Sequence, residues 1–144
     1  HYYLLNARVD DPFLFDTCHR IWPALDLAAM QAAAAQFVGT HDFSALCASG
    51  SSAAAHGDTV RTITDCTVVQ SGNLFTISVT ADGYLYNMVR ILAGTLVQAG
   101  LHKRTPDSIP PLLESRDRKQ AGPTLPAKGL FLERVDYPGL DAIS

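Results

Sequence analysis

The stretch YLYNMVRILAGTLVQAGL, residues 84–101, is the most apolar part of the chain and does most to decide its fold. Apolar side chains cover nearly the whole helical circumference, which is typical of a helix buried in the centre of a domain. We therefore predict a central helix over residues 84–99. Asp82 and Gly83 would turn the chain into it, and Gly100 would stop it.

Arg90 is the one formally charged side chain between Asp82 and Lys103, and it falls in the middle of this predicted helix. Leaving a buried guanidinium unpaired typically costs about 3–5 kcal/mol. The side chains three and four positions away include no carboxylate; they are Tyr86, Asn87, Ala93 and Gly94. We therefore expect the partner to come from another segment, across the open face that the small residues Ala93 and Gly94 leave.

Two interpretations of Arg90 remain open on these residues alone. One is a structural ion pair with Asp42, Asp65 or another acid of the chain, since such pairs often serve packing. The other is that Arg90 orients a catalytic carboxylate or grips a phosphate, because its rigid fork suits either group.

The N-terminal part of the chain predicts a strand, a helix and a loop. Mixed aromatic and branched residues predict a strand over residues 2–9. Asp26 is a good N-cap for a helix that runs to Phe37, and Gly39 would supply the residue that closes it. The small residues of 48–58 predict a surface loop.

Elements on both sides of the central helix complete the predicted fold. Strands 60–70 and 74–80, joined by turn residues 71–73, predict an antiparallel hairpin. A short helix over 105–114 and a last strand over 129–137 follow. Helices packed on a largely antiparallel sheet place the chain in the α+β class, and its 144 residues fit a single domain.

The overall charge does not mark a nucleic-acid binder, because the formal net charge is −3 and the sequence pI is about 5.9. Residues 100–134 are locally basic, with seven cations against four anions. The three cysteines lie far apart in sequence with no CxxC pair, so neither a disulfide framework nor a metal site is predicted. Reduced thiols and the polar residues in the apolar stretch favour a cytoplasmic protein without a membrane span.

Four groups of residues occur in the order found in one enzyme family. They are Gly83–Arg90 with Gly94, Thr95 and Gly100; Gly39–Ser44; Thr59–Ile63; and Arg116–Arg118 with 121–124, Pro126, Gly129 and Leu130. Together they span about two thirds of the chain, and they resemble the C-terminal domain of the tRNA pseudouridine synthase A family. Leu125 and Leu46 differ from the family, which more often has Ala and an aromatic residue there.

The resemblance implies isomerisation of uridine to pseudouridine in the tRNA anticodon stem-loop, at the positions called 38 to 40, without cofactor or metal. The family's nucleophilic aspartate lies in a Gly-Arg-Thr-Asp loop that this sequence lacks. By the same resemblance Arg90 orients that aspartate. We therefore expect the chain to be one domain, the C-terminal half of a longer enzyme, inactive by itself and forming a homodimer.

The family also uses a tyrosine against the flipped base, and it matches either a residue before His1 or Tyr2. Tyr2 can equally be a simple strand aromatic. The predicted RNA-binding cations are Arg61, Lys103, Arg104, Arg116, Arg118, Lys119 and Lys128. For three of them, Arg116, Arg118 and Lys119, capping of a helix end is the alternative. Arg61 can also be an ordinary surface cation.

Two other functions compete with catalysis. One is an RNA-binding or dimerisation module in which Arg90 contacts phosphate. The other is a small-molecule regulatory domain of similar fold, although the sequence has no glycine-rich loop for a phosphate.

Overall fold

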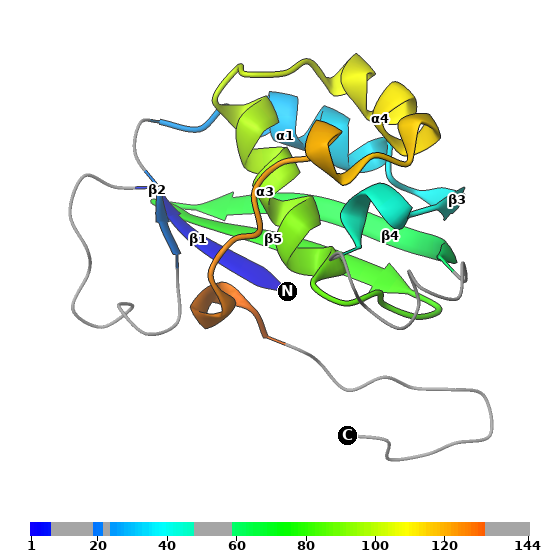
Figure 1. Ribbon diagram of the computed structural model, residues 1–144. Helices are drawn as coiled ribbons and strands as arrows, with labels where there is room; N and C mark the ends of the chain where they lie inside the picture. The colour runs from blue at the N-terminus through cyan, green and yellow to red at the C-terminus, as the bar shows by residue number, and fades with distance from the viewer. Residues whose placement is uncertain (7–18, 22–23, 48–58, 132–144) are drawn as a thin grey trace, which may run out of the picture.

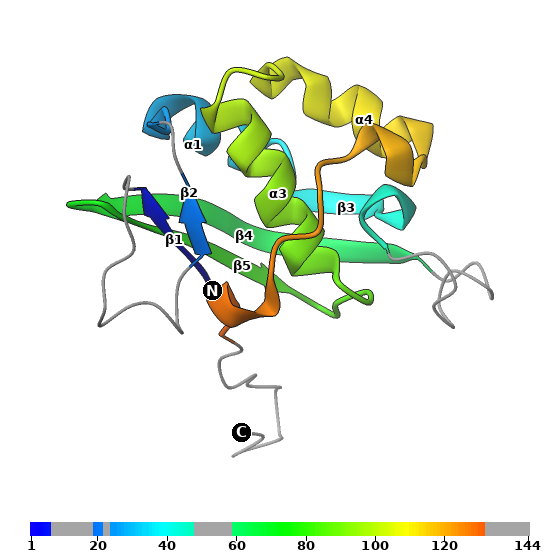
Figure 2. The same ribbon diagram turned by 60° about the vertical axis from the view of Figure 1, so that its left-hand side comes forward.

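The computed structural model describes residues 1–6, 19–21, 24–47 and 59–131. The strands are β1 Tyr2–Asn6, β2 His19–Ile21, β3 Gly39–Asp42, β4 Val60–Ser71 and β5 Leu74–Ala81, and the helices are α1 Leu27–Ala35, α3 Met88–Gly100 and α4 Ile109–Ser115. The strands form one sheet in the order β2-β1-β5-β4-β3, antiparallel except for the β1–β2 pair. All three helices lie on the same face of this sheet (Figures 1 and 2). The predicted α+β fold is confirmed.

The hairpin of β4 and β5 is the longest strand pair, and it turns where the sequence predicts. Ser71 pairs with Leu74, so the turn itself is Gly72 and Asn73. Gly72 has φ +59°, a left-handed conformation that glycine adopts without a steric penalty. Along β4 the buried side chains point to the helical layer, which fixes the register of the sheet against the core.

Asp26 caps α1 as predicted, because its carboxylate accepts a hydrogen bond from the backbone nitrogen of Ala29 at 3.2 Å. The end of the helix was predicted wrongly. It ends at Ala35, and Gly39 begins β3 with φ +123° instead of closing the helix. The polar strand β3 has no clear pattern of its own; pairing with β4 defines it.

The central helix α3 is as buried as predicted, with eleven of its 13 residues in the core. Its start was placed four residues too early. The Tyr84 hydroxyl turns back to β5, where it donates to the carbonyl of Val79 at 3.0 Å and accepts from the Ala81 nitrogen at 3.2 Å. Asn87, with φ 61°, then leads into the helix at Met88.

Gly100 has a different role from the predicted one. It is the last residue of α3, and the left-handed residue after the helix is His102, with φ 61°. A Cβ on Gly100 would lie 2.8 Å from Cγ of Met30 in α1. Gly100 therefore allows the two helices to approach closely.

Several predicted elements differ at their ends or fall outside the described residues. The short helix is confirmed as α4, preceded by a 3₁₀ turn at Pro106–Ser108. In place of the start of a last strand, Ala127–Gly129 form a 3₁₀ turn, and Leu130 makes an isolated antiparallel bridge to Tyr2. Loop 48–58, the end of the first strand after Asn6 and the strand after Phe131 lie outside the described residues.

Candidate functional site

Arg90 lies in the first turn of α3 and not in its middle, because the helix begins at Met88. Its side chain is half-buried. The backbone nitrogen of Ile91 donates to the carbonyl of Asn87 at 2.9 Å, the first hydrogen bond of the helix. Arg90 is thus held at the start of a rigid element, with part of its guanidinium still reached by solvent.

Two neutral oxygens orient the guanidinium. Nε donates to the backbone carbonyl of Leu125 at 2.7 Å, and Nη1 donates to Oδ1 of Asn87 at 3.0 Å. The helix offers no carboxylate, as predicted, and the partner at the helix start, Asn87, is a neutral amide. The partner from another segment is confirmed, but it is a carbonyl 35 residues away in sequence and no acid.

No carboxylate of the described residues pairs with Arg90, so the predicted ion pair with Asp42 or Asp65 is not formed. Asp42 pairs with Arg116 instead, at 3.4 Å. A carbonyl and an amide oxygen fix the direction of the guanidinium but leave its positive charge uncompensated. Within the described structure this charge remains available to an anion.

The segment that contributes Leu125 crosses α3 in an extended conformation; we call residues 122–126 the strap. Figures 1 and 2 show it in orange, running along α3 between α4 and the N-terminal end of the chain. A Cβ on Gly94 would lie 1.9 Å from the Pro123 carbonyl oxygen. The open face predicted beside Arg90 is confirmed, and the backbone of the strap fills it.

The strap is hydrogen bonded to α3 at both of its ends. The backbone nitrogen of Gly122 donates to Oγ1 of Thr95 at 3.0 Å, and that of Leu125 donates to the carbonyl of Arg90 at 3.2 Å. The side chain of Leu125 is buried in the core, so this departure from the family contributes to packing. Leu46, the other departure, is buried as well.

Tyr2 is a core residue, with 0% of its surface exposed. Its hydroxyl donates to the carbonyl of Pro126, and a Cβ on Gly129 would lie 2.7 Å from Cζ of its ring. Burial raises the pKa of Tyr2, and the nearby charge of Arg90 offsets part of this rise. The ring has no free face for a base in this geometry, which matches the strand-aromatic interpretation.

Arg104 and Arg118, two of the predicted RNA-binding cations, donate hydrogen bonds to the strap or to the residues just before it. Arg118 donates from Nη1 to the carbonyl of Gly122 at 2.8 Å and from Nη2 to Oγ1 of Thr124 at 3.0 Å. Arg104 donates from Nη2 to the carbonyl of Gln120. Both side chains are half-buried.

Three lysines and one arginine of the sheet also belong to the predicted RNA-binding set. The side chains of Lys103, Lys119 and Lys128 are exposed. Arg61 lies on β4, opposite His41 of β3, and donates from Nη1 to the carbonyl of Val60 at 2.7 Å.

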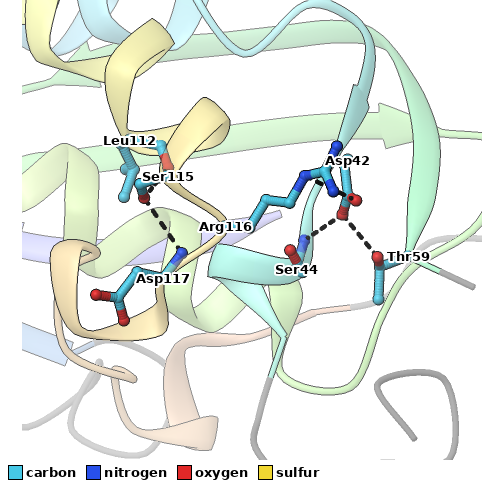
Figure 3. Close-up of polar contacts among 7 residues, drawn as sticks. All are labelled: Asp42, Ser44, Thr59, Leu112, Ser115, Arg116 and Asp117. Carbon is cyan, nitrogen blue, oxygen red and sulfur yellow. Dashed lines mark hydrogen bonds and ion pairs between the residues drawn. The ribbon is translucent and has the colours of Figure 1, made fainter. Parts of the chain in front are cut away.

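Arg116 follows α4 with φ 54°, and Figure 3 shows its side chain turned to Asp42 and not to the helix carbonyls. Asp42 also accepts from the Ser44 nitrogen at 3.0 Å and the Thr59 hydroxyl at 2.6 Å. Burial alone would raise the pKa of Asp42, but these hydrogen bonds and the Arg116 charge together lower it. The network ties α4 to the edge of the sheet.

A pocket of about 470 Å³ opens beside this network, between α1, β3 and α4. Its lining includes His41, Asp42, Glu114 and Arg116. Arg90 is not among its lining residues. The pocket is therefore separate from the candidate site.

Neither metal-binding nor membrane-spanning features occur in the part of the chain that the structure describes. Its His, Cys, Asp and Glu side chains form no group of three or more that could hold a metal ion. None of its helices is long and apolar enough to cross a membrane.

Sequence reasoning missed Asn87 and the Leu125 carbonyl as partners of Arg90, and Thr95 as the acceptor that holds Gly122 of the strap. Asn87 carried a usable signal, because asparagine tolerates left-handed φ and commonly stands at helix ends. A backbone carbonyl carries none, since every residue has one and only the fold selects it.

Comparison with known proteins identifies the family. The family described as tRNA pseudouridine synthase matches residues 33–138. Proteins named tRNA pseudouridine synthase A from Acetivibrio thermocellus and Moorella thermoacetica are each 44% identical over 136 residues, covering 94% of this chain and 54% of theirs. The protein of that name from Shouchella clausii is 43% identical, with 51% of its length covered. The chain thus spans about half the length of these curated relatives, and it belongs to the tRNA pseudouridine synthase family.

Proposed function

We propose that the complete protein isomerises uridine to pseudouridine in the tRNA anticodon stem-loop, at positions 38 to 40, and that this chain supplies the C-terminal half of the active-site cleft. Family membership and the names of its relatives support a tRNA pseudouridine synthase. The choice of the anticodon stem-loop as substrate rests on the resemblance of the four groups of residues to the family. In this proposal the nucleophilic aspartate belongs to the rest of the protein, and this chain alone is inactive.

The state of Arg90 is the observation that carries the proposal. Its guanidinium is fixed in direction by Asn87 and Leu125, both neutral acceptors, while no described carboxylate neutralises it. A group that must receive a carboxylate from another domain needs this combination, since orientation is set in advance and the charge is kept for the incoming partner. Arg90 then holds the aspartate in line with the flipped-out nucleotide.

The predicted RNA-binding cations other than Arg104 and Arg118 are proposed to grip phosphates. This group consists of Arg61, Lys103, Arg116, Lys119 and Lys128. Exposed lysines suit a nonspecific grip on the RNA backbone, because phosphate contacts need charge and little geometry. The protein acts without metal or cofactor in this proposal, in the cytoplasm, where the buried free thiols of Cys47 and Cys66 stay reduced. The proposal also includes a homodimer, which is supported by the resemblance alone.

The proposal is tested with the protein expressed from its complete gene and an anticodon stem-loop RNA that carries tritium at carbon 5 of the uracils. Isomerisation moves the glycosidic bond to carbon 5 and releases the tritium. We expect release from uridines at positions 38 to 40 and none from a stem-loop with cytidine there. Tight RNA binding without release would overturn catalysis and favour the RNA-binding module, in which Arg90 contacts phosphate.

A further inference from the structure

Arg118 differs from the neighbouring cation in how its charge is used. Both residues lie in the 3₁₀ turn Arg118–Gln120, which Asp117 caps by accepting from the Lys119 nitrogen at 3.0 Å. The Lys119 side chain is exposed, whereas Arg118 is half-buried and directs both terminal nitrogens inward. These two hydrogen bonds direct the guanidinium of Arg118 to the protein, whereas the Lys119 ammonium is directed to solvent.

The two acceptors of Arg118 belong to the strap. The guanidinium bridges the carbonyl of Gly122 at 2.8 Å and the hydroxyl of Thr124 at 3.0 Å, so it closes the turn that leads to Leu125. Two different nitrogens of one planar group bind these oxygens, an arrangement that the single nitrogen of lysine does not reproduce. The contact therefore requires arginine geometry and not merely a positive charge.

The strap in turn determines where Arg90 points. Leu125 directly follows the clamped Thr124, and its carbonyl accepts from Nε of Arg90 at 2.7 Å. The strap has little room to move relative to α3, because the Pro123 carbonyl already packs against Gly94. A shift of the turn that Arg118 binds would therefore move the Leu125 carbonyl and, with it, the guanidinium of Arg90.

We propose that Arg118 is a positioning residue for the isomerisation, which sets the direction of Arg90 through the strap and does not contact RNA. The inference rests on the proposed role of Arg90. It replaces the sequence-based assignment of Arg118 to the RNA-binding cations. Misplacement of a catalytic group by as little as about 1 Å can cost on the order of a hundredfold in rate.

The test compares Arg118→Lys and Arg118→Gln with Lys119→Gln, all in the complete protein. The single-turnover rate of pseudouridine formation and the tRNA Kd are measured over a range of salt concentrations. We expect both Arg118 variants to lose about tenfold or more in rate, with Kd and its salt dependence unchanged. Lys119→Gln should weaken tRNA binding and reduce the salt slope by about one. If Arg118→Lys keeps the wild-type rate, or if Arg118→Gln reduces the salt slope as Lys119→Gln does, the inference is overturned.

Hydrogen exchange gives a readout that is independent of activity. The Leu125 amide, which donates to Arg90, should exchange faster in both Arg118 variants and remain protected in Lys119→Gln. Unchanged protection in Arg118→Gln would contradict the positioning role even if its rate falls. The proposed function can fail separately: wild-type turnover by Arg90→Ala would contradict the catalytic role of Arg90. The exchange result would still show whether Arg118 holds the strap in place.

Discussion

Arg90 and Leu125 are hydrogen bonded to one another in both directions. Nε of Arg90 donates to the Leu125 carbonyl at 2.7 Å, and the Leu125 nitrogen donates to the Arg90 carbonyl at 3.2 Å. The first contact orients the side chain and the second fixes the backbone of the strap on the same residue. The direction of the guanidinium and the path of the strap therefore depend on each other.

Thr95→Val should detach the Gly122 end of the strap from α3. The buried Thr95 hydroxyl donates to the Ile91 carbonyl at 2.9 Å and accepts from the Gly122 nitrogen at 3.0 Å. Valine would leave the Gly122 nitrogen without an acceptor, at a cost of about 1–3 kcal/mol. Hydrogen exchange at Gly122 checks this; it should speed up in Thr95→Val but not in Thr95→Ser, which keeps the hydroxyl. Equal protection in both variants would show that Thr95 does not hold the strap.

Gly94→Ala should be strongly destabilising although alanine is the better helix former. The new Cβ would lie 1.9 Å from the Pro123 carbonyl oxygen, so backbone must move. We expect a loss of about 3 kcal/mol or more in the free energy of unfolding, the upper end for overpacking, measured by urea denaturation. Gly72→Ala is the matched control, because its Cβ meets nothing within 4 Å and only its φ of +59° opposes it, at about 1–2 kcal/mol. A smaller loss for Gly94→Ala than for Gly72→Ala would refute the close approach.

Asp42→Asn should change how stability depends on acid. The hydrogen bonds of Asp42 favour its ionised form and lower its pKa in the folded protein, so its contribution is present above the unfolded value of about 3.9 and disappears as pH falls through the lowered value. Urea denaturation from pH 6 down to pH 2 should therefore show a smaller acid-induced loss in Asp42→Asn, with a cost of about 1 kcal/mol at neutral pH.

Arg116→Gln is the control for Asp42→Asn. The Arg116 side chain is 69% exposed, so its ion pair with Asp42 should contribute less than about 1 kcal/mol. This variant should keep most of the acid dependence, because Thr59 and Ser44 still bind the carboxylate. Identical acid curves for Asp42→Asn and the unmodified protein would show that Asp42 is not the group responsible.

The parts of the fold with local signals were predictable from the sequence. The hairpin has its own turn at Gly72 and Asn73, and Asp26 marks the start of α1. The short strands β2 and β3 lack such signals, because pairing with β1 and β4 defines them. The start of α3 was misplaced because Tyr84 is apolar enough for a helix, while its hydroxyl finds better partners on β5.

The candidate site was predictable in its central residue only. Arg90 was found because it is a lone charge in an apolar stretch, and the small Gly94 correctly indicated an open face, which the backbone of the strap occupies. The acceptor on Leu125 could not be inferred, since a carbonyl has no sequence signature. Arg118 was assigned to RNA for its charge, whereas its hydrogen bonds to the strap depend on the fold.

The most direct test of the account is the single-turnover rate of pseudouridine formation by Arg90→Ala and Arg90→Lys in the complete protein, on anticodon stem-loop RNA bound at saturation. Because the guanidinium is proposed to orient the nucleophile, neither alanine nor the charge-retaining lysine should form measurable pseudouridine. Both variants should still fold, as circular dichroism would show. Turnover at the wild-type rate in either variant would contradict the catalytic role of Arg90.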